Sequence, residues 1–243
     1  STTAMQAVDN STTAMQAVTN STTAMQAVVN STTAMQAVVN STTAVQAVVN
    51  STTAMQAVAN STTAMRAVAT SYVAEAAIWA NSSAVAVVKA YSNAWRIFTG
   101  ASSSVVGKTA VALVGLNPND YADMAAVAAS STAMAAVAAS STAMTAVAAS
   151  STAMTACGAS QTALNAIADS TTALDALYAE RSTMRGASKA MSGKFIILEI
   201  SSENDFDTSR YGYATLSDGS QPNWCDYKSK YAYFKQYKKI ATY

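Results

Sequence analysis

The chain has 243 residues, of which 51% are hydrophobic and only 11% are charged, and its formal net charge is +1. This balance provides no strong field for binding nucleic acid or a membrane surface. Histidine is absent, which removes the commonest general base and metal ligand, so we expect neither a histidine-based triad nor a usual zinc site. No apolar run approaches the roughly eighteen residues of a membrane span, and we expect no membrane insertion.

A ten-residue unit, Ser-Thr-Thr-Ala-Met-Gln-Ala-Val-x-Asn, repeats almost unchanged from Ser1 to Thr70. In one continuous helix its methionines would lie about 80° apart around the axis, so no apolar stripe would form. One short helix per repeat avoids this problem, with serine as N-cap, about two turns, and asparagine ending the helix in the left-handed conformation. The methionine and the valine three residues later then share one face. We therefore predict an α-helical solenoid whose core includes Met5, Val8, Met15, Val18, Met25 and Val28.

A β-solenoid with ten residues per coil has the same period and is the alternative fold, although the seven repeats contain no glycine or proline to turn its corners. The ninth position varies and accepts Asp9, which predicts that it lies outside the core. Burying one repeat's apolar side chains contributes roughly 5 kcal/mol, whereas ordering ten residues costs about 15 kcal/mol. Stability must come from stacking on other repeats or other copies, so we expect a homo-oligomer or filament.

The ten-residue spacing continues with bulkier residues as far as residue 98, which makes residues 1–98 the first array. Residues 99–119 lose the spacing and contain three glycines and a proline, which predicts an irregular joint or a short strand pair. Within this segment, Ser102–Thr109 resembles the end of a phosphate-binding loop but lacks the first glycine of that motif, which favours a glycine-flexed joint. The diverged pairs of the first array are Glu75 with Ile78, Val85 with Val88, and Trp95 with Phe98.

A second array, residues 120–191, repeats the same unit with its phase shifted by one residue. Serine keeps the capping position, while asparagine is replaced by alanine or aspartate. Cys157 stands where neighbouring repeats carry an aliphatic residue, which predicts a buried structural thiol and not a nucleophile. The core of this array is expected to include Met134, Val137, Met144 and Val147.

Residues 192–243 change character and predict a small β-rich module with aromatic and basic side chains. Expected strands are 194–200 and 210–216, with a final strand or hairpin over 230–243. The acidic stretch Glu203–Asp207 lacks the spacing of a calcium loop and is interpreted as a solvated loop. Aromatic residues provide flat surfaces suited to sugars or a protein partner, although alternation along strands assigns some of them to the module's own core. The candidate recognition residues are Tyr211, Tyr213, Trp224, Tyr227, Tyr231, Tyr233 and Tyr237.

The units Ser-Thr-Ala-Met-Ala-Ala-Val at 131–137 and Ser-Thr-Ala-Met-Thr-Ala-Val at 141–147 resemble the decapeptide arrays of tail-fibre and other virion structural proteins of tailed bacteriophages. This resemblance implies a virion appendage and supplies no catalytic residue.

We accordingly expect a structural fibre or appendage protein in the virion or outside the cell, with no enzymatic activity, cofactor, metal or nucleic-acid partner. Its repeats would act as a spacer, and its C-terminal module would dock other virion proteins or a host-surface glycan or protein. The alternatives are a cell-surface adhesin or extracellular filament subunit and, more remotely, an ice-binding protein that uses the repeated threonines, of which Thr2 and Thr3 are the first pair.

Overall fold

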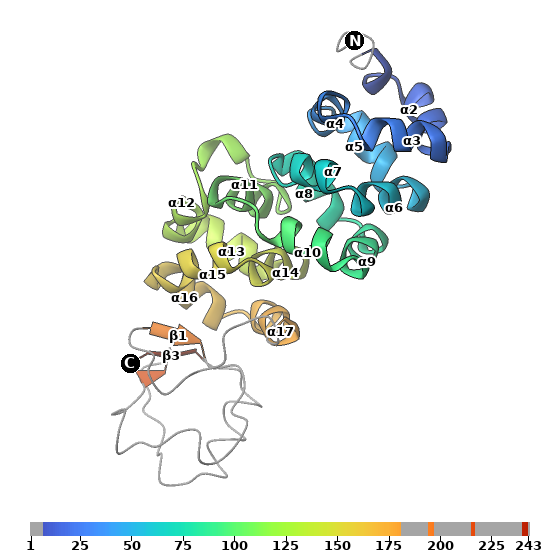
Figure 1. Cartoon of the computed structure of the whole chain (residues 1–243). Coiled ribbons are helices and arrows are strands. Elements are labelled where there is room, and N and C mark those ends of the chain that lie inside the picture. Colours follow the sequence, from blue (N-terminus) through green and yellow to red (C-terminus); the bar gives the residue numbers. More distant parts are fainter. Residues whose placement is uncertain (1–6, 181–193, 197–214, 217–239, 243) are drawn as a thin grey trace. The chain divides into compact units, whose positions relative to one another are not determined.

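The computed structural model describes residues 7–180, 194–196, 215–216 and 240–242. Short helices follow one another along residues 7–180, about one per ten residues, as Figure 1 shows. In the first part of the chain these are α2 (Thr12–Thr19), α3 (Thr22–Val29), α4 (Thr32–Val39), α5 (Thr42–Val49), α6 (Thr52–Asn60), α7 (Thr62–Val68), α8 (Tyr72–Trp79), α9 (Ser82–Ala90), α10 (Ser92–Thr99), α11 (Ser103–Ala112) and the 3₁₀ helix η1 (Pro118–Asp120). They continue as α12 (Met124–Ala129), α13 (Ser131–Ala139), α14 (Ser141–Ala149), α15 (Ser151–Gly158), α16 (Gln161–Ala168) and α17 (Thr171–Ala179).

Serine begins the regular helices, as the sequence predicts. Ser21, for example, is extended at φ −107° and ψ 110°, and its side chain accepts a hydrogen bond of 3.2 Å from the backbone N–H of Ala24. The predicted left-handed asparagine is wrong, because Asn30 stays right-handed at φ −86° and ψ −8°. The chain turns at the next serine instead, where the extended Ser31 N–H donates to the Val28 carbonyl at 3.0 Å. One extended residue is therefore enough to join two helices, and α13 and α14 are bent by 103° at such a junction.

Each helix packs against the helix three places further along the chain. In residues 1–123 this gives the columns α2, α5, α8 and α11; α3, α6 and α9; and α4, α7 and α10. In residues 124–180 the corresponding pairs are α12 with α15, α13 with α16, and α14 with α17. Three ten-residue repeats, each with one helix, thus make one coil of the solenoid. Residues 7–180 are built from helical solenoid repeats, and the ten-residue β-solenoid is wrong because the repeats are helical.

The capping serines also connect successive coils. Ser61 Oγ donates a hydrogen bond of 2.8 Å to the carbonyl of Val29, and Ser71 Oγ donates one of 2.8 Å to the carbonyl of Val39. Each partner lies 32 residues earlier, so the bond reaches from one coil to the previous one. We call this set the serine ladder, and it also contains Ser41 with Asp9 at 2.7 Å, Ser51 with Thr19 at 3.1 Å, Ser160 with Ala128 at 2.6 Å and Ser170 with Ala138 at 2.5 Å.

The apolar positions of the repeat form the core, as predicted. Met15, Met25 and Val28 are buried, whereas Val8 and Val18 are half-buried, and Met5 lies outside the described residues. In the second array Met134, Val137, Met144 and Val147 are fully buried.

The prediction that the ninth position lies outside the core is wrong. Asp9, Thr19 and Val29 are only 1%, 2% and 1% exposed. The carbonyl of each of these residues accepts a serine-ladder bond, which places the ninth position at the contact between two coils.

The segment expected to be a joint or strand pair contains the helix α11, and the strand pair is therefore wrong. Ser102 caps this helix by accepting from the Val105 N–H at 3.4 Å, so the sequence that resembles a phosphate-binding loop is helical instead. The helix ends at Ala112, and the turn after it passes through Gly115, whose φ of +74° favours glycine, while Leu116 N–H donates back to the Val111 carbonyl at 3.0 Å. Residues 99–119 therefore contribute one further repeat in a shifted phase.

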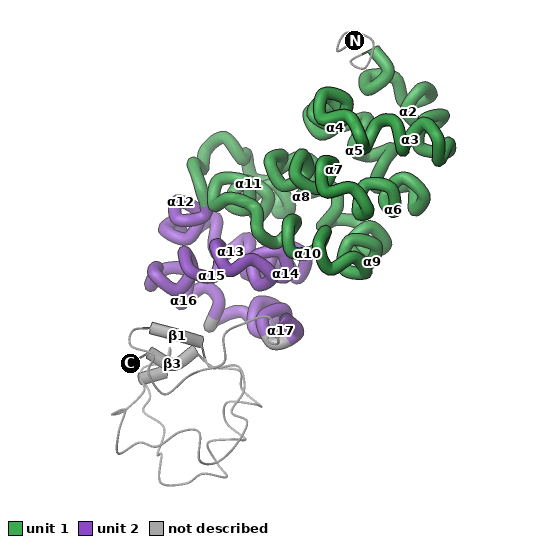
Figure 2. The backbone as a smooth tube through the Cα atoms, viewed as in Figure 1, with its two compact units in different colours: residues 1–123 green, residues 124–243 purple. Residues whose placement is uncertain are grey.

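The chain divides into two compact units, residues 1–123 and residues 124–243 (Figure 2). The strands β1 (Lys194–Ile196), β2 (Thr215–Leu216) and β3 (Ile240–Thr242) form an antiparallel sheet in the order β1-β3-β2, with Phe195 opposite Ala241. The rest of residues 192–243 lies outside the described residues, so a β-rich module there stays a prediction.

None of the described helices is long and apolar enough to cross a membrane alone, and the one pair that meets this test together is the bent pair α13 and α14.

Candidate functional site

The aromatic residues that the sequence singles out lie outside the described residues. This applies to Tyr211, Tyr213, Trp224, Tyr227, Tyr231, Tyr233 and Tyr237, to the acidic stretch 203–207 and to Cys225. Cys157 is described, and it is fully buried, as predicted. Burial raises the pKa of its thiol to about 12, which keeps it protonated and unreactive near neutral pH.

A polar and basic surface lies on the column of α7 and α10, and we call it the α7–α10 face. Arg66 and Arg96 are exposed, occupy the same sixth position of their repeats, and lie on helices that pack together. Arg96 Nη2 donates to Asn93 Oδ1 at 3.0 Å, and Asn93 Nδ2 donates to Thr62 Oγ1 at 3.1 Å across the two helices. These bonds hold one of the two guanidinium groups in place.

Tyr91 extends this face at the start of α10, where the regular repeats have serine. Its hydroxyl accepts a hydrogen bond of 3.4 Å from Asn60 Nδ2, at the end of α6. Between residues 10 and 119 the only acidic residue is Glu75, and it is buried. No exposed carboxylate in that segment therefore neutralises Arg66 and Arg96, and the face attracts anionic groups. Tyrosine and arginine are also the residue types that concentrate binding energy at interfaces.

An aromatic cluster packs α10 onto α8. The ring centroids of Trp79 and Phe98 are 5.0 Å apart, and those of Trp79 and Trp95 are 5.8 Å apart in an edge-to-face arrangement. Lys89 Nζ lies 4.7 Å from the centroid of the Trp95 ring, which is within the range of a cation–π contact. The cluster fixes the helix that carries Arg96.

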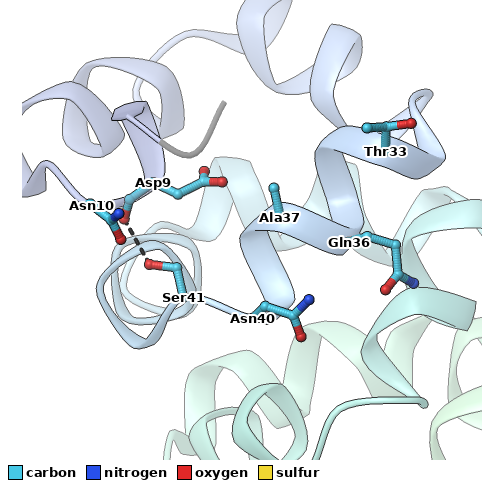
Figure 3. A pocket seen from close by; sticks show the side chains of 7 residues that line it. All are labelled: Asp9, Asn10, Thr33, Gln36, Ala37, Asn40 and Ser41. Atoms are coloured by element: carbon cyan, nitrogen blue, oxygen red, sulfur yellow. Dashed lines mark hydrogen bonds between the residues drawn. The ribbon is translucent and has the colours of Figure 1, made fainter. Parts of the chain in front are cut away.

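A second polar site is a pocket of about 420 Å³ near the N-terminal end of the described residues (Figure 3). Ser41 Oγ closes one side by donating to the Asp9 carbonyl at 2.7 Å. Both carboxylate oxygens of Asp9 are buried without a hydrogen-bond partner, and this burial raises the pKa of the carboxyl group. The exposed side chains of Asn10, Thr33, Gln36 and Asn40 line the pocket, a set of hydrogen-bonding groups that suits a polar ligand. Its lining residues are Asp9, Asn10, Thr33, Gln36, Ala37, Asn40 and Ser41.

Sequence reasoning missed the α7–α10 face, although it left a signal. The sixth position is glutamine in the preceding regular repeats, and arginine replaces it at residues 66 and 96. The two substitutions are thirty residues apart. This spacing becomes informative only when three helices are known to make one coil, because residues thirty apart then lie on packed helices of one column. Within the described residues, no group of three or more Cys, Asp or Glu side chains is placed to hold a metal ion.

No family model matches the sequence, and no curated protein is significantly similar to it. The fold and the surface chemistry of this chain are therefore the grounds on which a function can be assigned.

Proposed function

We propose that this chain is a non-enzymatic structural protein whose solenoid serves as a rigid scaffold. The observation that carries the proposal is the serine ladder, in which one hydroxyl both caps a helix and bonds to the previous coil. Ser61 accepts from the Ala64 N–H at 3.2 Å while it donates to the Val29 carbonyl at 2.8 Å. Such repeated coupling suits a part that holds its shape under load.

The coil geometry makes this scaffold short for its length in residues. Packed helices lie about 8–10 Å apart, so each coil of thirty residues adds about 10 Å along the solenoid. The same thirty residues in one straight helix would span about 45 Å. Most of each repeat therefore adds to the width and surface of the solenoid, and little adds to its length. Adding or removing one coil changes the length of such a spacer by only about 10 Å.

The assignment to a virion appendage is the finer part of the proposal, and its support is the resemblance of residues 131–147 to phage decapeptide arrays. The same architecture suits a cell-surface adhesin or filament subunit, and the ice-binding alternative also stays a prediction. In a virion appendage, and equally in an adhesin or filament subunit, the recognition role belongs to residues 192–243 or to the α7–α10 face. Formation of a homo-oligomer or filament is also part of this finer proposal.

Deletions test the scaffold proposal. Removal of residues 21–50 takes out one coil, keeps every helix in its column, and should shorten the folded protein by about 10 Å in solution scattering. Removal of residues 21–30 should also fold, but it moves α2 into another column. Removal of residues 21–25 leaves half a repeat without its capping serine and should lower the midpoint of unfolding more than either of the other deletions. Equal tolerance of all three deletions would contradict a scaffold built on register.

A contact function at the α7–α10 face is favoured by the exposure of Arg66 and Arg96 on two helices that pack together. The double variant R66Q/R96Q restores the glutamine of the regular repeats, so its fold should be unaffected. We expect it to bind polygalacturonate, a carboxylate-bearing probe, at least tenfold more weakly than the parent chain at low salt. Q46R, which adds a cation in another column, is the matched control. Unchanged binding by R66Q/R96Q would remove this face as a contact surface.

A further inference from the structure

Glu75 is buried in the core of residues 1–123, at the fifth position of its repeat, where most regular repeats carry methionine. Its side chain is 1% exposed, and Oε1 has no hydrogen-bond partner. Oε2 accepts a hydrogen bond of 3.3 Å from Thr109 Oγ1 on α11. Thr109 is also 1% exposed and stands seven residues after the capping Ser102, at the position that valine takes in the regular repeats. Two polar residues thus replace apolar ones at a single contact between α8 and α11.

The surroundings of Glu75 provide no compensating charge. The helix α8 packs against α5, α7, α9 and α11, and α10 contacts it through the aromatic cluster. The helix α5 contains no ionisable side chain, and the cations on the other four helices are Arg66, Lys89, Arg96 and Lys108, of which the first three are exposed and Lys108 is half-buried. Tyr72, on α8 itself, is half-buried. Burial raises the pKa of Glu75 well above its ordinary value, and the hydrogen bond from Thr109 is a smaller, opposing effect.

We propose that the contact between Glu75 and Thr109 is an acid-stabilised latch, in which protonated Glu75 holds α11 against α8 and loss of the proton releases α11. Burying a carboxylate without a cation has a high free-energy cost. This cost is removed most easily where a small movement lets water reach the carboxylate. The helix α11 is the last α-helix of residues 1–123, and within that unit no later helix of its column covers it. Its release therefore exposes Glu75 without opening the interior coils.

The direction of the pH dependence follows from proton binding. With α11 docked, Glu75 holds its proton to a higher pH than it does after release, where its pKa returns towards the ordinary 4.5. The docked state therefore binds more protons than the released state, and rising pH favours release. Between the ordinary and the raised pKa the equilibrium constant for release should increase by up to tenfold per pH unit, and below pH 4.5 this contribution is constant.

Hydrogen exchange on the full chain tests the latch. Amide protection over Val106–Ala112, corrected for intrinsic exchange, should fall by up to tenfold per pH unit above pH 4.5 in the parent chain. The variant E75Q cannot ionise and should show no such fall, and E75M, which restores the residue of the array, should behave in the same way. T109V removes the bond that lowers the pKa of docked Glu75, so its loss of protection should begin at the same pH as in the parent chain but continue to a higher pH before it levels off.

Two results would overturn the proposal. One is the same pH profile in the parent chain and in E75Q or E75M, which would separate α11 release from Glu75. The other is a parallel loss of protection over α2 to α7, which would show global unfolding instead of release of one helix. If E75Q unfolds, E75M alone decides the first point. Trp79 lies one turn after Glu75 on α8, and its fluorescence gives an independent reading of the same transition.

Discussion

Ser71 and Val39 are joined by a buried hydrogen bond of 2.8 Å between the serine hydroxyl and the valine carbonyl, 32 residues apart. The same hydroxyl accepts from the Ala74 N–H at 3.3 Å, so one side chain satisfies a group in each of two coils. In S71A both groups lose this partner, and we expect the free energy of unfolding to fall by about 2–3 kcal/mol. Chemical denaturation measures this change.

Ser21 provides the matched control, because it caps α3 at 3.2 Å and its hydroxyl makes no serine-ladder bond within the described residues. S21A should therefore cost only about 1 kcal/mol, the usual value of a lost cap. Asn81 shows that asparagine can perform both tasks, since its Oδ1 accepts from Ala84 at 3.1 Å and its Nδ2 donates to the Val49 carbonyl at 3.2 Å. S71N should consequently be milder than S71A. Equal losses in S71A and S21A would show that the bond between coils adds no stability.

Val45 is the one fifth-position residue of the seven regular repeats that is not methionine, and it borders an apolar cavity of about 20 Å³. Filling such a cavity is worth about 0.5 kcal/mol at roughly 24 cal/mol per Å³. We expect V45M to raise the free energy of unfolding measured in urea by that increment. M35V, which should enlarge the same cavity, is the opposite control. A destabilised V45M would mean that the core is already filled and the longer side chain is forced out of its rotamer.

Three glycines should respond differently to alanine. Gly158 ends α15 with no atom within 4 Å of an added Cβ, so G158A should gain up to about 1 kcal/mol in helix stability. At Gly100 the added Cβ would lie 2.9 Å from the Arg96 carbonyl oxygen, and G100A should be destabilised. Gly115 has open space but a φ of +74°, which should cost G115A about 1 kcal/mol. Thermal unfolding ranks the three variants, and a destabilised G158A would contradict the local geometry.

The sequence predicts the helices of this fold better than their arrangement. Serine capping and the spacing of methionine and valine are local signals, and both hold in the structure. The partner of each helix is not a local property, because any ten-residue unit is compatible with several numbers of helices per coil. The burial of Asp9 and the placement of Arg66 and Arg96 on helices that pack together both depend on that number, so neither could be predicted. Gly107 was misleading for another reason, since it lies buried inside α11 and does not break it.

Distances between exposed sixth-position residues test most directly the claim that three helices make one coil. In a C157V/C225S background, spin labels at Gln26 and Gln56 probe helices of one column, α3 and α6, whereas labels at Gln26 and Gln46 probe different columns. Electron paramagnetic resonance should show the closer approach for residues 26 and 56, with helix axes about 10 Å apart, although they are further apart in sequence. A distance that is shorter for residues 26 and 46 than for 26 and 56 would contradict the three-helix coil.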